Sequence, residues 1–110
     1  MLGVHILGTI VNKNGRMLDL SGIENKLALS VKQTKLKVVK KTNFNFGPFR
    51  GATYCFILAQ SHLIVHTWPE NDVITFDLFT CGDRQSALEA IKNISKFTNG
   101  EIKKVNVIKL

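Results

Sequence analysis

The chain has 110 residues, enough for one domain with one hydrophobic core and not for two. Hydrophobic residues make up 45% of it, which excludes a disordered chain, and no apolar run approaches the ~20 residues of a membrane helix. The net charge of +7 would suit a nucleic acid, but no aromatic residues interleave the lysines to stack on bases. We therefore expect a single domain over residues 1–110, with a solvated basic face and with neither a nucleic acid nor a membrane as partner.

The N-terminal residues and the cysteines bear on the compartment. Residues 1–5 carry no basic region followed by a long apolar run, so we expect no signal peptide and a cytoplasmic protein. Cys55 and Cys81 both lie in apolar strand patterns. One disulfide is arithmetically possible, but free thiols fit a chain without a secretion signal better.

The periodicity of apolar residues predicts eight elements. In chain order they are a strand over 3–11, a helix within 17–35, strands over 36–46, 53–59, 63–66 and 73–80, a helix from about 83 to 98, and a strand over 102–110. Asp19 or Ser21 is expected to cap the first helix, and Asp83 or Ser86 the second.

The strand over 36–46 is expected to have one buried face. Leu36, Val38, Phe44 and Phe46 share one parity, and lysines occupy the other. Together, the element order predicts an α+β fold: a two-layer sandwich in which an antiparallel sheet carries two helices on one face.

Polar, reactive residue types gather between 60 and 82, inside an apolar surround. The motif Ser61-His62-x-x-x-His66-Thr67-Trp68-Pro69-Glu70 is followed by Asp77-Leu78-Phe79-Thr80-Cys81-Gly82. A serine, a histidine and a cysteine on adjoining strands could meet at one point, as a site requires. These motifs resemble those of the short prokaryotic S-adenosylmethionine decarboxylases, pyruvoyl enzymes that cleave their own chain.

The resemblance implies cleavage between Gln60 and Ser61, into fragments 1–60 and 61–110. The Ser61 hydroxyl would attack the carbonyl of Gln60, and β-elimination from the resulting ester would leave a covalent pyruvoyl cofactor derived from Ser61. His66 matches the histidine that serves as base in this processing, and imidazole exchanges protons near neutral pH.

Further residues take roles by the same resemblance. Thr53 corresponds to the hydroxyl residue that supports the oxyanion during processing, and Cys81 to the thiol that protonates the substrate carbon after carbon dioxide leaves. Glu70, with Phe46 or Phe49, corresponds to the nucleoside contacts. The resemblance also implies the substrate S-adenosylmethionine, a place in polyamine biosynthesis, and homodimers whose sites draw groups from both protomers.

Outside the motif, the same residues would be unremarkable. Ser61 would be a turn serine, His66 a satisfied core histidine and Cys81 a small core residue. His5, His62 and His66 do not have the spacing of metal ligands, so we expect no metal site.

The sequence departs from the family pattern at three places. Gln60 stands where a glutamate is usual, and Tyr54 follows Thr53 where a glycine is usual. The strand over 3–11 lacks the carboxylate that helps to hold the charged end of the substrate. Two alternatives therefore stay open: a pyruvoyl-dependent arginine or ornithine decarboxylase of the same fold, and an unprocessed paralogue that binds a nucleoside or a partner without catalysis.

Overall fold

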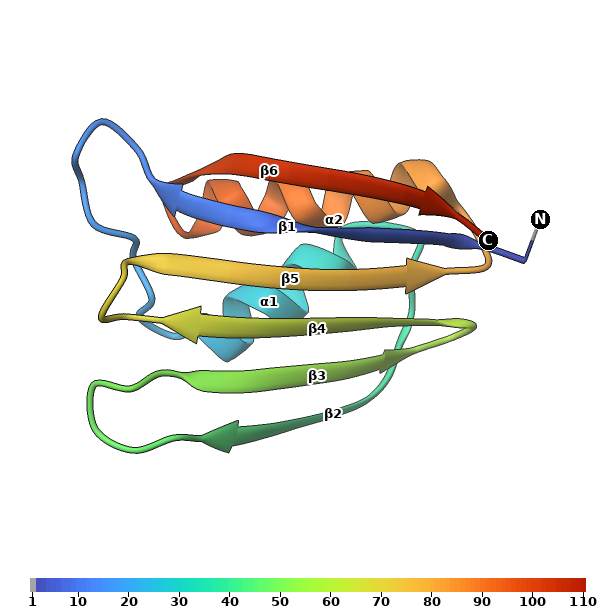
Figure 1. Ribbon diagram of the computed structural model, residues 1–110. Coiled ribbons are helices and arrows are strands. Elements are labelled where there is room, and N and C mark those ends of the chain that lie inside the picture. Colours follow the sequence, from blue (N-terminus) through green and yellow to red (C-terminus); the bar gives the residue numbers. More distant parts are fainter. Residues whose placement is uncertain (1) are drawn as a thin grey trace.

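The computed structural model describes residues 2–110, so Met1, the first residue of the expected domain, lies outside the described residues. The elements are β1 (Val4–Asn12), α1 (Ile23–Lys32), β2 (Val38–Asn45), β3 (Ala52–Leu58), β4 (Ser61–Trp68), β5 (Val73–Thr80), α2 (Arg84–Phe97) and β6 (Gly100–Lys109). The strands form one antiparallel sheet in the order β2-β3-β4-β5-β1-β6. Both helices cover the same face of this sheet (Figure 1), which confirms the predicted two-layer α+β sandwich.

The hydrophobic core lies between the helices and the sheet. Alternate residues of β4 and β5 are buried, as expected for strands with one face against helices. The fully buried core side chains include Ile6, Ile10, Leu27, Val31, Phe56, Leu63, Val65, Ile74, Leu78, Ile91 and Ile94.

The opposite face of the sheet, which neither α1 nor α2 covers, is called the open face below. By strand register it carries His5, Leu7, Thr9, Phe44, Phe46, Thr53, Cys55, Ile57, His62, Ile64, His66, Trp68, Thr75, Asp77, Phe79 and Ile108. Many of these side chains are apolar, and Phe44, Phe46, Ile57, Trp68 and Ile108 are exposed.

The first helix is shorter than predicted and is capped differently. It begins at Ile23, because Gly22 at the N-cap has a left-handed backbone with φ of 58° that ends the preceding turn. No side chain caps α1, so the predicted cap by Asp19 or Ser21 is wrong. The Asp19 carboxylate instead accepts hydrogen bonds from the backbone N–H and the hydroxyl of Ser21, and these bonds lower the pKa of Asp19.

The prediction of a buried face on β2 is also wrong for its second half. A bulge between Val38 and Lys40 shifts the register by one residue, and such a slip moves later side chains to the other face. Phe44 and Phe46 therefore lie on the open face, where 67% and 41% of their surfaces are exposed.

The second half of the chain follows the sequence pattern, except that β4 spans Ser61–Trp68 where a strand over 63–66 was predicted. Asp83 caps α2 by accepting hydrogen bonds from the backbone N–H groups of Gln85 and Ser86, which confirms one of the two predicted caps. Cys55 and Cys81 are free thiols, as expected. Within residues 2–110 we find no helix that is long and apolar enough to cross a membrane.

Candidate active site

The Gln60–Ser61 bond lies where the β3–β4 hairpin enters β4. The hairpin loop consists of Ala59 and Gln60, since Leu58 pairs with Ser61 across the ladder. Gln60 has a left-handed backbone with φ of 58°, which costs a non-glycine residue on the order of 1 kcal/mol. The bond predicted to break is therefore preceded by a strained residue.

Ser61 and Thr80 form a directly opposed pair on β4 and β5. The Ser61 hydroxyl donates to Thr80 Oγ1 at 2.8 Å, and Thr80 Oγ1 also accepts from the backbone N–H of Gly82 at 2.9 Å. Thr80 is buried, and its Oγ1 accepts the hydrogen bond that the Ser61 hydroxyl donates. The lone pairs of Ser61 Oγ therefore remain available for attack.

Cys81 follows β5 directly and contacts the hairpin loop. Its backbone N–H donates a hydrogen bond of 3.1 Å to the carbonyl oxygen of Gln60. A backbone N–H in this place polarises the carbonyl and would stabilise an oxyanion that develops on it. The structure thus brings Gln60, Ser61 and Cys81 together, and Cys81 is exposed beside the bond.

Thr53 and His66 lie at the other end of the sheet. They oppose each other on β3 and β4, and Thr53 Oγ1 lies 2.8 Å from His66 Nδ1. His66 is five residues from Ser61 along one strand, which is about 17 Å at 3.3 Å per residue and places the two side chains on opposite faces. Within one chain, neither Thr53 nor His66 reaches Ser61.

The β2–β3 loop and the β4–β5 turn, which hold residues predicted to contact a nucleoside, lie at the end of the sheet opposite the β3–β4 hairpin (Figure 1). Phe46 is on the open face, where the Phe44 and Phe46 rings meet edge to face with centroids 5.6 Å apart. Phe49 is 92% exposed in the β2–β3 loop, and Glu70 is exposed in the β4–β5 turn.

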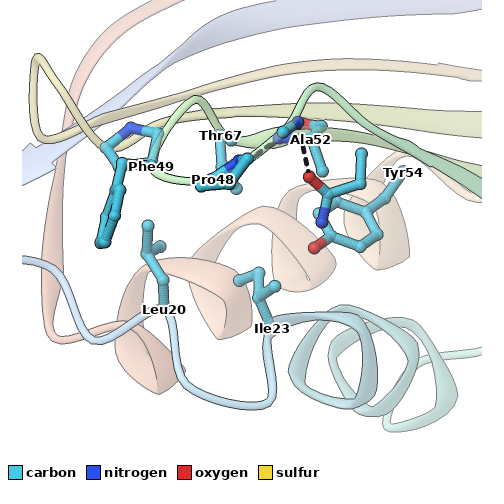
Figure 2. A pocket seen from close by; sticks show the side chains of 11 residues that line it. Leu20, Ile23, Pro48, Phe49, Ala52, Tyr54 and Thr67 are labelled. Atoms are coloured by element: carbon cyan, nitrogen blue, oxygen red, sulfur yellow. Dashed lines mark hydrogen bonds between the residues drawn. The ribbon is translucent and has the colours of Figure 1, made fainter.

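A cavity of about 510 Å³ lies between the β2–β3 loop and the start of α1. Figure 2 shows side chains that line it. Leu20 and Ile23 form one wall, and Pro48, Phe49 and Tyr54 lie across from them. The cavity is on the helix side of the sheet, so apart from Phe49 it does not include the predicted site residues.

Tyr54, one of the departures from the family pattern, lines this cavity. It pairs with Val65 and faces α1, away from the open face and from the Gln60–Ser61 bond. Partial burial raises the pKa of Tyr54, and the nearby Glu24 carboxylate adds to this effect. The phenol therefore stays neutral at physiological pH, and its bulk does not crowd the bond.

Two contacts between polar residues were not predicted from the sequence. Thr80 is part of the predicted Phe-Thr-Cys-Gly motif, but its contact with Ser61 depends on the β4–β5 register. His5, His62 and Asp77 come from three different strands and meet on the open face. A lone carboxylate at an open-face position of an apolar strand was the available signal for Asp77.

Comparisons with known proteins agree with this fold and motif. A family model described as S-adenosylmethionine decarboxylase matches residues 5–109. An S-adenosylmethionine decarboxylase proenzyme of Hydrogenobaculum sp. (strain Y04AAS1) is 38% identical over 94 residues, which cover 84% of this chain and 69% of the relative. One of Methanococcus maripaludis (strain DSM 14266) is 34% identical over 109 residues, or 98% of this chain and 88% of the relative.

A solved structure is also similar. The crystal structure of the adenosylmethionine decarboxylase from Aquifex aeolicus VF5 superposes with a TM-score of 0.76 at 31% sequence identity, and the match covers 97% of this chain and 87% of that chain. The chain belongs to the S-adenosylmethionine decarboxylase family.

Proposed function

We propose that this chain cleaves itself between Gln60 and Ser61, and that the processed protein releases carbon dioxide from S-adenosylmethionine to feed polyamine biosynthesis in the cytoplasm. The main support for this proposal is that Ser61, the Gln60 carbonyl that it would attack, and Cys81 lie together in a chain of this family. Relatives are named as proenzymes, which agrees with a chain that matures by cleavage.

The processing chemistry begins at Ser61. Its Oγ attacks the carbonyl carbon of Gln60, the peptide C–N bond breaks, and an ester and a free amine form. A base then removes the Cα proton of residue 61, and the Cβ–Oγ bond breaks, which releases residues 1–60 with a carboxylate on Gln60. Residue 61 becomes a dehydroalanine with a free amine, which tautomerises to an imine, and water hydrolyses this imine to the pyruvoyl carbonyl with release of ammonia. The Cys81 N–H and the strained Gln60 backbone both favour the first step.

The residues around Ser61 fit the formation of a pyruvoyl group at position 61. When present, this group supplies a carbonyl that withdraws electrons from the α-carbon of an amino-acid substrate. Thr80 supports the position from β5, and Cys81, an exposed free thiol, contacts the Gln60 carbonyl through its backbone. Cys81 would deliver a proton to the substrate carbon after carbon dioxide leaves.

A homodimer completes the site in this proposal. His66 and Thr53 are too far from Ser61 to act within their own chain. A two-fold axis over the open face would bring the His66 end of one protomer to the Ser61 end of the other. The exposed apolar side chains of the open face favour burial against a second copy.

The substrate preference rests on the aromatic and acidic residues at the His66 end. Phe46 or Phe49 offers a flat face for an adenine ring, with Glu70 nearby for the ribose. None of the open-face positions of β1 carries a carboxylate, and Thr9 among them is flanked by Thr75 and Lys104. This gap leaves arginine and ornithine as the second candidate substrates.

Intact-mass analysis of the purified protein tests processing. We expect two fragments from the wild type, and one uncleaved chain from Ser61→Ala. An intact wild type after prolonged warm incubation would favour the non-catalytic paralogue. Release of carbon dioxide from carboxyl-labelled S-adenosylmethionine, arginine and ornithine tests the substrate, and faster release from either basic amino acid would overturn our choice.

Mixing two inactive variants tests the shared site. His66→Ala should stop at the ester, which hydroxylamine then cleaves. Coexpressed with Ser61→Ala, the His66→Ala chain should be processed, because its intact Ser61 meets the partner's intact His66. If the His66→Ala chain stays uncleaved in verified mixed dimers, the two-protomer site is wrong.

A further inference from the structure

The open face carries a compact cluster of His5, His62 and Asp77 at the Ser61 end of the sheet. His5 Nε2 lies 2.5 Å and His62 Nε2 lies 3.4 Å from Asp77 Oδ1. All three ligand-type atoms lie within 4.8 Å of one another. The cluster is called the His–Asp–His cluster below.

The sheet order explains why the three side chains meet. β5 lies between β4 and β1, and both His5 and His62 oppose Phe79 across their ladders. Asp77 is two residues from Phe79 on the same face, so it lies diagonally between the histidines. Three paired strands hold the donors, and such rigid elements preorganise a site better than loops do.

The Phe79 ring restricts both imidazoles. It stacks on His62 with centroids 5.9 Å apart and meets His5 edge to face at 6.3 Å. In the single chain the three side chains of the cluster are 28–40% exposed on the open face, the face that the proposed homodimer would cover.

The charges of the cluster suit a divalent cation. Among the described residues, the two histidines are the only ion-pair partners of Asp77, and no lysine or arginine competes for its carboxylate. With neutral imidazoles the cluster carries one negative charge. Two imidazole nitrogens and a carboxylate oxygen are a donor set that zinc and neighbouring transition metals accept, with further positions left for water.

We infer that His5, His62 and Asp77 form a binding site for one divalent transition-metal ion of the Zn²⁺ class. The ligand atoms are Nε2 of His5, Nε2 of His62 and Oδ1 of Asp77. This assignment replaces the expectation of no metal site, which had weighed the three histidines only. Within one chain, His66 lies four residues beyond His62 on β4, about 13 Å away, so it is not a ligand of the same ion. Asp77 is the third ligand instead.

The site does not depend on the proposed decarboxylase reaction, so it can be tested in a chain that cannot process. The full-length Ser61→Ala protein, freed of metal with a chelator, is titrated with Co²⁺ and followed by visible absorption. We expect one saturable ion per chain with the spectrum of a four- or five-coordinate site, displaced by Zn²⁺. Thermal unfolding should shift upward with added Zn²⁺, because only the folded chain presents the three ligands together.

Variants in the same Ser61→Ala background assign the ligands. Asp77→Asn and His62→Gln should each weaken Co²⁺ binding by more than about tenfold. Cys55→Ser and Cys81→Ser, which change the two free thiols of the described residues, should bind as before. Thermal unfolding of each variant without metal shows whether it is folded, and two ligand variants keep the test decisive if one is not.

Three outcomes would overturn the site. One is no saturable binding of Co²⁺ or Zn²⁺ by the folded Ser61→Ala chain. Another is undiminished binding in both Asp77→Asn and His62→Gln. The third is loss of binding in Cys55→Ser or Cys81→Ser instead, which would place the metal elsewhere.

Discussion

The backbone N–H of Cys81 donates to the carbonyl oxygen of Gln60 over 3.1 Å, and this bond ties the end of β5 to the β3–β4 hairpin. The carbonyl that Ser61 would attack is thus already polarised in the uncleaved chain. The residue that carries the carbonyl is also the one with a left-handed backbone. Both features belong to the main chain. We therefore expect the backbone conformation of residue 60 to affect cleavage more than the identity of its side chain does.

Two substitutions of Gln60 separate the effect of its side chain on the rate of self-cleavage from the effect of its backbone conformation. Gln60→Gly removes the cost of the left-handed backbone before cleavage, so processing should slow about fivefold if roughly 1 kcal/mol of strain is released in the reaction. Gln60→Glu keeps the conformation and should process at a rate close to that of the wild type. Time courses of fragment appearance measure both. A Gly variant as fast as the wild type would show that the strain does not contribute.

Thr80 should orient the attacking hydroxyl. Thr80→Val preserves the shape of the side chain but removes the acceptor for Ser61, and we expect processing to slow roughly five- to tenfold, the effect of about 1 kcal/mol. Thr80→Ser retains the acceptor and serves as the control. Equal rates for Val and Ser would contradict the orienting role.

Cys81 should matter for turnover more than for processing. Its backbone N–H remains in Cys81→Ala, so we expect two fragments to form. Decarboxylation by the processed variant should fall on the order of 100-fold or more, because a proton donor is lost. The variant should also inactivate during turnover as protonation goes to the wrong carbon. Full decarboxylation by Cys81→Ala would exclude the thiol as donor.

Ile57 tests the open face as a dimer interface. It is 48% exposed there, and Ile57→Glu should shift the protein toward monomers by placing a charge in the buried contact. Leu29, 45% exposed on α1, is the matched control, and Leu29→Glu should leave the assembly unchanged. Sedimentation analysis distinguishes the two. Identical behaviour of both variants would argue against this interface.

Asp83 should give α2 a pH-dependent stability. The backbone N–H of Ser86 is the main cause that lowers the pKa of Asp83, with help from the Ser86 hydroxyl and the Gln85 N–H. The folded-state pKa lies below the unfolded value of about 3.9, so the stabilisation is present above that value and lost as pH falls through the folded pKa. Thermal unfolding of Asp83→Ala against wild type should differ at pH 6 and converge on acidification. A difference independent of pH would contradict a charged cap.

Some features of the site were predictable from local sequence alone. The motif identified Ser61 and Cys81, and these two residues meet because a tight hairpin and an antiparallel neighbour bring the start of β4 and the end of β5 to one edge. The odd separation of Ser61 and His66 already implies opposite faces once both lie on one strand. The strand predicted from the sequence covers only 63–66 and does not include Ser61, so the pattern did not show this consequence.

The sequence by itself determined the family motif and the element order and narrowed the cap of α2 to Asp83 or Ser86, because each depends on residues within a few positions of one another. Only the tertiary structure decided that a bulge turns Phe44 and Phe46 to the open face, and that His66 lies far from Ser61. It also decided that His5, His62 and Asp77 meet, since β1 pairs with β5 across more than sixty intervening residues. Such pairings are chosen by the packing of the whole sheet against its helices, and no local pattern encodes them.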